Sequence, residues 1–224
     1  MRRRDVLYCS CIKNRREEMN AHDFYSAFVR EAREETLVTE DMLPSFPTEW
    51  GKATYFDLYR NNETAYTELV NKYIVHKIIS ENGMTAQHEY FRIDMVGWVT
   101  RYNEMEEEAH GLNLSAHLWD LMAAVEHENS RKDWTDEIMK LIHVKCPLKV
   151  VISYSPCDER DTAEWKKLAF IAKWMREVKA FALGGEEYLL IFGNCYNAKT
   201  KADYTTFDYR GYLYNCSKSC FERI

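Results

Sequence analysis

The chain has 224 residues, of which 46% are hydrophobic and 14% aromatic; this is enough apolar material for a sizeable core and excludes a disordered chain. With only 8 Gly and 4 Pro it is not linker-rich, and no apolar run approaches the roughly 20 residues of a membrane helix, so we expect no membrane partner. The formal net charge of −6 excludes binding to a polyanion through bulk charge and leaves a local basic patch as the route to one.

The first half of the chain predicts two helices followed by two strands. Apolar residues recur at helical spacing within residues 23–35 and again, as a longer stripe, over residues 62–80. Residues 89–101 and 118–128 alternate between apolar and polar side chains, as strands do. Residues 103–111 between them are rich in Glu, and we expect them to form a solvated loop.

The second half predicts alternating helices and strands. Residues 133–143 form a short amphipathic pattern, and a longer helix is expected to begin near residue 161 with a capping-box-like start. The nearly all-apolar segment 148–154 is typical of the centre of a sheet, as is segment 188–193, and segment 209–214 is expected to be an edge strand. The order predicts an α/β protein with a mixed central sheet flanked by helices.

Three acidic residues lie inside the predicted strands, where acids are uncommon and rarely buried without a partner: Asp94, Glu126 and Glu128. The two glutamates are two residues apart, so they share one face of their strand. Pairing of the two strands in antiparallel fashion would bring Asp94 close to both, and Glu68 on the preceding helix would add a fourth carboxylate.

Such a cluster of carboxylates needs a counter-charge. Two like charges at about 4 Å cost roughly 4 kcal/mol at an effective dielectric constant near 20, so converging carboxylates protonate, splay apart or bind a cation. Oxygen ligands favour Mg²⁺ or Mn²⁺ over Zn²⁺. Such an ion activates water and holds phosphate oxygens, so the pattern indicates hydrolytic phosphoryl chemistry.

Each of these residues also has a structural interpretation. Glu126 and Glu128 are compatible with the solvated face of an edge strand, and Glu68 with an exposed helix position. Asp94 is compatible with a salt bridge to Arg92 or Arg101. His127 shares its strand face with apolar residues and is compatible with a core histidine that has its hydrogen bonds satisfied.

The order of these elements resembles the PD-(D/E)xK nuclease superfamily, whose restriction-endonuclease-like core is αβββαβ. The resemblance covers residues 62–155 and is carried by Glu68 on the helix, Ile93-Asp94 on a strand, Glu126-His127-Glu128 on the next, and the apolar strand 148–154. Only two of the three strands before the second helix are clear, since residues 85–87 form a weak strand pattern. Ile93 stands where proline is common, and Glu128 stands at the lysine position.

The resemblance implies a set of site residues. Asp94, Glu126, the main-chain carbonyl of His127 and the helix acid Glu68 would hold Mg²⁺ or Mn²⁺. Glu128, which some restriction endonucleases carry at this position, would orient or deprotonate the attacking water. Lys149 is a candidate for a displaced lysine that contacts the substrate.

The resemblance also implies a function. It predicts a metal-dependent endonuclease that acts on DNA, and cleavage of both strands would favour a homodimer; the alternative is a nuclease-fold protein that has lost catalysis and serves as a binding module for nucleic acid or protein. Residues 1–61 are expected to form an N-terminal arm and a helix, and residues 62–224 the nuclease-like domain, with an additional helix and strands after the core. The seven Cys do not resemble a disulfide framework and favour a cytoplasmic protein with reduced thiols.

Overall fold

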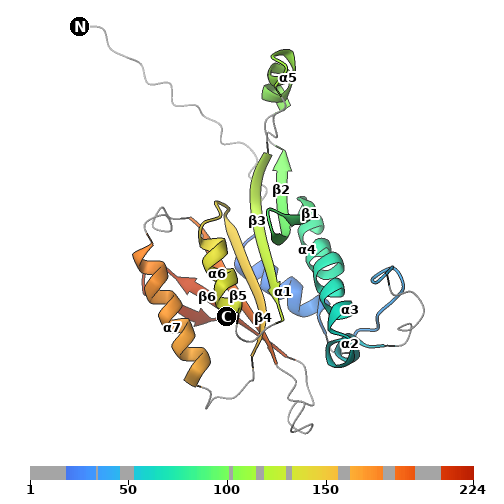
Figure 1. The fold of residues 1–224 in the computed structure, drawn as a ribbon, viewed down its shortest axis with the longest axis vertical. Coiled ribbons are helices and arrows are strands. Elements are labelled where there is room, and N and C mark those ends of the chain that lie inside the picture. Colours follow the sequence, from blue (N-terminus) through green and yellow to red (C-terminus); the bar gives the residue numbers. More distant parts are fainter. Residues whose placement is uncertain are drawn as a thin grey trace.

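A computed structural model describes residues 19–33, 35–45, 53–100, 103–114, 119–129, 133–155, 162–178, 185–194 and 208–224. Within these ranges, one mixed sheet runs through the molecule, with its strands in the order in which they occur along the chain (Figure 1). The strands are β1 (Thr85–Tyr90), β2 (Ile93–Thr100), β3 (Trp119–Glu128), β4 (Leu148–Ser155), β5 (Glu187–Asn194), β6 (Tyr209–Asn215) and β7 (Cys220–Arg223).

The helices are short, and most of them lie on the two faces of the sheet. They are α1 (Ala21–Glu31), α2 (Tyr55–Asn61), α3 (Glu63–Glu68), α4 (His76–Glu81), α5 (Asn103–Gly111), α6 (Trp134–Ile142) and α7 (Thr162–Glu177), and the π-helical segment η1 (Leu69–Val75) joins α3 to α4. No helix of the described residues is long and apolar enough to cross a membrane.

Strand directions follow the connections. β1, β2 and β3 pair antiparallel, β3, β4 and β5 pair parallel, and β6 and β7 return antiparallel. The two parallel pairs need crossovers, which α6 and α7 supply. Because both crossovers step in the same direction along the sheet, the right-handed rule places α6 and α7 on the same face.

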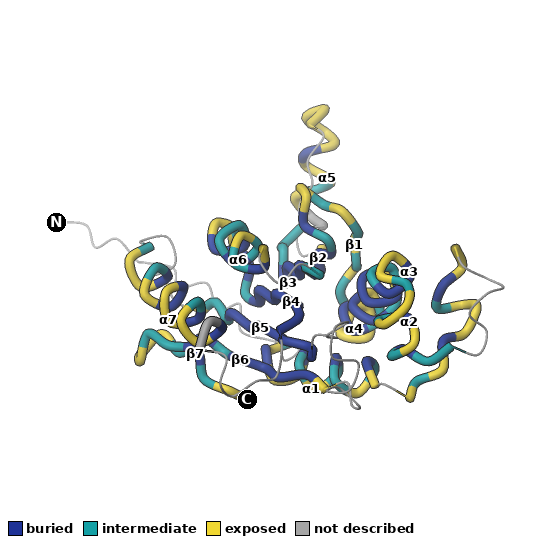
Figure 2. The backbone as a smooth tube through the Cα atoms, turned by 60° about the horizontal axis from the view of Figure 1, so that its bottom comes forward, coloured by how far each residue is buried: buried dark blue, intermediate teal, exposed yellow. Residues whose placement is uncertain are grey.

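Two hydrophobic cores lie on opposite faces of the sheet (Figure 2). One core packs α1 to α4 against one face, to which β3 contributes Ala123 and Val125. The other packs α6 and α7 against the opposite face, to which β3 contributes Ala124. The alternation predicted for β3 is present from Ala123 onward, so Glu126 has the parity of the α6 and α7 face. It is wrong for Leu121, because a register shift opposite Gly97 and Trp98 turns Leu121 onto the same face as Ala124.

The structure confirms the mixed α/β architecture and differs from the expectation in detail. β1 is a full strand although its side chains alternate only between exposed and half-buried, so it has no apolar stripe that a sequence pattern could reveal. Residues 103–111 form α5 in place of the expected loop. β6 is not an edge, because β7 pairs with it from the outside.

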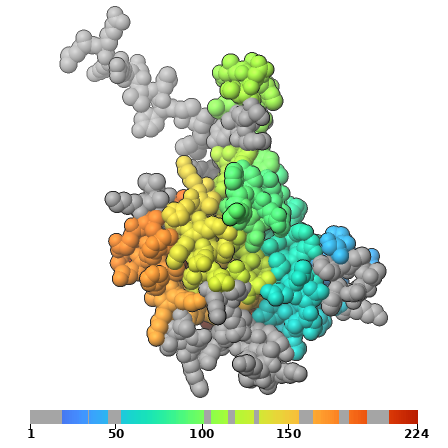
Figure 3. Space-filling model, viewed as in Figure 1, coloured from blue at the N-terminus to red at the C-terminus, as the bar shows by residue number. Residues whose placement is uncertain are grey.

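The N-terminal residues that the structure describes belong to the main body. α1 contributes Phe24 and Phe28, and α2 contributes Tyr55 and Leu58, to the same core as the helix that follows. The arm that precedes Met19 lies outside the described residues. α5 instead protrudes beyond the body next to the ends of β2 and β3, as Figure 3 shows.

A network of buried hydroxyl groups ties the helical layer to the sheet. The Tyr66 hydroxyl lies 2.7 Å from that of Tyr55, 2.8 Å from that of Tyr209 and 2.6 Å from that of Tyr154. Tyr55 and Tyr209 also bond to each other, and His127 Nε2 lies 2.7 Å from the Tyr154 hydroxyl. Since these groups are all buried, each depends on the others for its hydrogen bonds.

Replacing Tyr66 by Phe should lower the free energy of unfolding by about 2 kcal/mol, because three buried hydroxyls lose a partner together. Urea unfolding measures this change. The matched control is Tyr73→Phe, a half-buried tyrosine on η1, which should change stability by less than about 0.5 kcal/mol. Equal losses in the two variants would contradict the central position of Tyr66.

Candidate functional site

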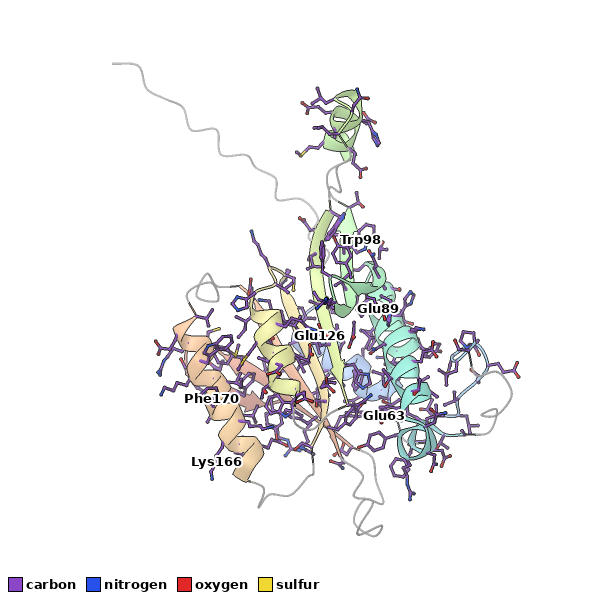
Figure 4. All side chains as sticks on the ribbon, viewed as in Figure 1. Glu63, Glu89, Trp98, Glu126, Lys166 and Phe170 are labelled. Carbon is purple, nitrogen blue, oxygen red and sulfur yellow. The ribbon has the colours of Figure 1, made fainter. Side chains whose placement is uncertain are left out.

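The antiparallel pairing of β2 and β3 places two carboxylates opposite each other. The pairing ends at Met95 opposite Val125, and one further step along the same register sets Asp94 opposite Glu126. Directly opposed residues have Cβ atoms about 5 Å apart and share a face of the sheet. The structure therefore brings these two predicted site residues together on the face that carries α6; Figure 4 labels Glu126, which lies toward the C-terminal end of β3.

Asp94 also ends the ladder of backbone hydrogen bonds between the two strands. Its Oδ2 accepts a hydrogen bond of 2.8 Å from the main-chain N–H of His127. This bond fixes the carboxylate beside β3. No ion pair joins Asp94 to Arg92 among the described residues, and Arg101 lies outside them.

A lysine on α6 completes the group. The Lys140 ammonium lies 2.7 Å from Glu126 Oε1 and 2.5 Å from Glu137 Oε2, and it donates a 3.0 Å hydrogen bond to the carbonyl of Arg92. Glu137 and Lys140 are three residues apart and so lie on the same side of the helix. We call Asp94, Glu126, Glu137 and Lys140 the acid–lysine cluster. Sequence analysis missed Lys140, because the register of a crossover helix over a strand cannot be derived from spacing.

Burial dominates the electrostatics of the two strand acids. Desolvation raises the pKa of Glu126 to about 8. The contact with Lys140 lowers this pKa, and the negative charge of the neighbouring Asp94 raises it further. Desolvation also raises the pKa of Asp94, and the hydrogen bond from His127 opposes it. Partial burial lowers the pKa of Lys140, but its contacts with Glu126 and Glu137 outweigh this and the net shift is upward. The cluster thus holds Asp94 and Glu126 where ionisation is costly.

His127 is a core histidine. Its ring lies on the opposite face from Glu126, packed edge-on against Tyr66 and Tyr154, and desolvation lowers its pKa to about 3. Nε2 bonds to Tyr154, whereas Nδ1 is buried without a hydrogen-bond partner among the described residues. The side chain is therefore neutral, and the residue reaches the cluster only through its main chain.

Glu128 and Glu68 are placed differently from the two central acids. Glu128 is half-buried at the end of β3, on the same face as Glu126 and two residues along, which is about 7 Å. Glu68 belongs to α3 on the other face of the sheet, where its carboxylate bonds to Lys72 and Ser45. The expectation that Glu68 joins the other acids is wrong for this arrangement, because its side chain is engaged elsewhere.

Lys149 is also placed differently from the expectation. It lies on β4 opposite Ala124, is completely buried, and pairs at 2.5 Å with Glu186, the residue immediately before β5. A side chain with no exposed surface cannot contact a substrate from this position. Lys149 is thus a structural buried cation, and Lys140 is the lysine that lies beside the strand acids.

The cluster offers a partial set of ligands for a hard cation. The described residues contain no group of three or more His, Cys, Asp or Glu side chains arranged to hold a metal ion. The expected convergence of three or four carboxylates is therefore not present. Asp94 and Glu126 nevertheless fit Mg²⁺, which proteins commonly bind through one or two carboxylates while waters and substrate phosphates fill the remaining positions.

No protein-family model matches the chain, and no curated protein matches it. The geometry of the cluster therefore carries the functional argument.

In the absence of divalent ions, the free energy of unfolding should fall as the pH rises from about 5 to about 8. Glu126 has its folded-state pKa near 8 and an ordinary value of 4.5 when unfolded, so in this window the folded protein binds more protons. The stability that Glu126 contributes is fully present below the unfolded pKa and is lost as the pH rises through the folded pKa, by about 5 kcal/mol at most. Urea unfolding in EDTA measures it, and the dependence should flatten in Glu126→Gln.

Proposed function

We propose that the protein is a metal-dependent endonuclease-like phosphodiesterase that acts on DNA. The observation that carries the proposal is the acid–lysine cluster, in which two carboxylates from adjacent strands face each other and a lysine touches one of them. The element order around the cluster supports it, since a helix, β1 to β3, α6 and β4 follow one another as in the αβββαβ core of PD-(D/E)xK nucleases. In this proposal Lys140 takes the role of the lysine of the family motif, because Glu128 occupies the position where that lysine normally stands.

Each residue of the cluster would have a distinct task. Asp94 and Glu126, with the main-chain carbonyl of His127, would hold Mg²⁺ or Mn²⁺, which when bound activates water and neutralises charge on a phosphate. Lys140 places a positive charge next to the carboxylates, where it would stabilise the negative charge that develops on the phosphate. Glu128, on the same face, would orient or deprotonate the attacking water.

The test is cleavage by the full chain of supercoiled plasmid and of single-stranded circular DNA, with Mg²⁺, with Mn²⁺ and with EDTA. We expect nicking that requires the divalent ion, together with a higher melting temperature when the ion is present, because binding to the folded state stabilises it. No cleavage of either substrate and no thermal shift would overturn the proposal. Cleavage of both strands at one site would further indicate a twofold dimer.

A second candidate is a binding module of the same fold without catalysis. It is favoured by the surroundings of Lys140, whose ammonium already forms ion pairs with Glu126 and Glu137 and donates a hydrogen bond to the Arg92 carbonyl. These contacts engage the ammonium within the protein, without a substrate. Binding of nucleic acid without cleavage, unchanged by Asp94→Asn, would favour this candidate over the nuclease.

A further inference from the structure

The turn between β1 and β2 has an unfavourable backbone conformation. Tyr90 pairs with Ile93, which leaves Phe91 and Arg92 as the two residues of a tight hairpin turn. Both have positive φ, 50° and 62°, as a type I′ turn requires. Such turns favour Asn and Gly, and a bulky residue with positive φ is an outlier that costs on the order of 1 kcal/mol or more. The backbone conformation of the turn therefore gives no reason for a phenylalanine at position 91.

The side chain presented by this turn is an exposed aromatic ring. Phe91 is 81% exposed, the largest exposure among the exposed large hydrophobic residues of the described chain. Phe91 is in edge contact with Tyr90 at 4.5 Å between ring centroids, and Tyr90 in turn contacts Trp119 at 5.4 Å. Trp119 lies 5.8 Å from Trp98. These four rings, which we call the aromatic strip, form one continuous chain of contacts.

The aromatic strip adjoins the acid–lysine cluster. Tyr90 and Trp98 pack on the sheet face that also carries Glu126, and Trp98 is labelled farther along the β2–β3 pair than Glu126 in Figure 4. The turn is tied to the cluster directly, because Lys140 donates to the Arg92 carbonyl while it contacts Glu126. The Lys140 side chain thus contacts both Glu126 and the turn that displays Phe91.

We propose that the aromatic strip is a stacking platform for unpaired bases, so that the ligand of this face is a single-stranded polynucleotide. The inference deepens the proposed function and rests on it. Aromatic rings bind bases of any sequence through their π-faces, but only where the bases are not paired. The exposed ring of Phe91 meets this requirement, and the exposed Arg92 beside it supplies a positive charge for the backbone phosphates.

The test measures binding of the full chain to labelled oligothymidylate, oligouridylate and a DNA duplex by fluorescence anisotropy, in EDTA and at fixed salt. We expect the single strands to bind more tightly than the duplex. Phe91→Asn should weaken single-strand binding about tenfold and leave duplex binding unchanged, whereas Phe91→Trp should retain it. Asn suits positive φ, so this variant should be at least as stable as the wild type in urea, which separates loss of the ring from loss of the fold.

Each result decides the proposal. Single-strand binding that is no tighter than duplex binding, a Phe91→Asn effect below twofold, an equal effect on the duplex, or an equal loss in Phe91→Trp would overturn it. A preference for uridylate or for thymidylate identifies which nucleic acid the strip takes. Binding that depends on the Phe91 ring, without any cleavage, would overturn the proposed nuclease function and support the stacking role of the aromatic strip. Cleavage of DNA together with unchanged single-strand binding in Phe91→Asn would support the nuclease function and overturn the stacking role.

Discussion

The variants Asp94→Asn and Glu126→Gln should each lose divalent-dependent DNA cleavage by about 100-fold or more while retaining the fold. An amide oxygen is neutral and binds a hard cation more weakly than a carboxylate does, so the ion that would stabilise the reacting phosphate is bound poorly or lost. Both amides keep an oxygen that accepts the hydrogen bond or contact of the wild type, from His127 N–H in one case and from Lys140 in the other. The initial rate of plasmid nicking measures the effect.

The matched control for these variants is Asp120→Asn. Asp120 is an acidic residue on the same strand as Glu126 but lies six residues away, which is about 20 Å. It should retain the wild-type rate and the thermal shift with Mg²⁺. Glu128→Gln distinguishes water activation from metal binding. If Glu128 orients the attacking water, this variant should lose cleavage but keep the thermal shift with Mg²⁺. If both Asp94→Asn and Glu126→Gln cleave DNA at the wild-type rate, the assignment of these residues as metal ligands is wrong.

The cost of replacing Lys140 by Met should grow with pH. Near pH 9 the Glu126 carboxyl is ionised in the wild type, because its pKa is about 8, and removal of Lys140 then leaves a buried charge without its partner. Breaking a buried pair in this way costs about 3 kcal/mol. Near pH 6 Glu126 is already protonated in the folded protein, so the same substitution should cost about 1 kcal/mol or less.

A double-mutant cycle identifies the interaction responsible. In the Glu126→Gln background, Lys140→Met should cost the same small amount at both pH values, since no charge is left to compensate. Lys166→Met, at an exposed lysine of α7, is the control for the loss of a surface charge and should change stability by less than about 0.5 kcal/mol. Urea unfolding in EDTA provides all the values, and a cost that is independent of pH would contradict the pairing of Lys140 with Glu126.

The elements that sequence analysis predicted well are those with a strong apolar pattern. From Ala123 onward β3 alternates between the two cores, and this pattern placed Glu126 and His127 on opposite faces. A register shift before it puts Leu121 against the same core as Ala124, which the sequence pattern did not predict. β4 is buried along its whole length, as its apolar composition predicts. Asp94 stood out because an acid inside an apolar strand needs a partner, and the structure supplies one in the His127 N–H.

The elements that it missed are defined by distant contacts. β1 becomes a strand only because the turn at Phe91 and Arg92 folds it onto β2, and that turn contains neither of the residues that signal a hairpin. Lys140 belongs to the site because α6 crosses back over β3, which is a matter of tertiary register. Glu68 has a plausible position along the chain, yet its helix packs on the other face.

The consecutive order of the seven described strands has a consequence for how the chain folds. Each strand pairs with the one that precedes it in the sequence, so every new pairing closes only the loop or crossover between them. Each pairing therefore adds only a small entropic cost of loop closure, and the mean sequence separation of contacting residues stays low for a molecule built on a large sheet. The sheet can therefore grow from a single advancing edge during synthesis, and refolding from urea should be fast relative to β-proteins whose neighbouring strands are far apart in sequence.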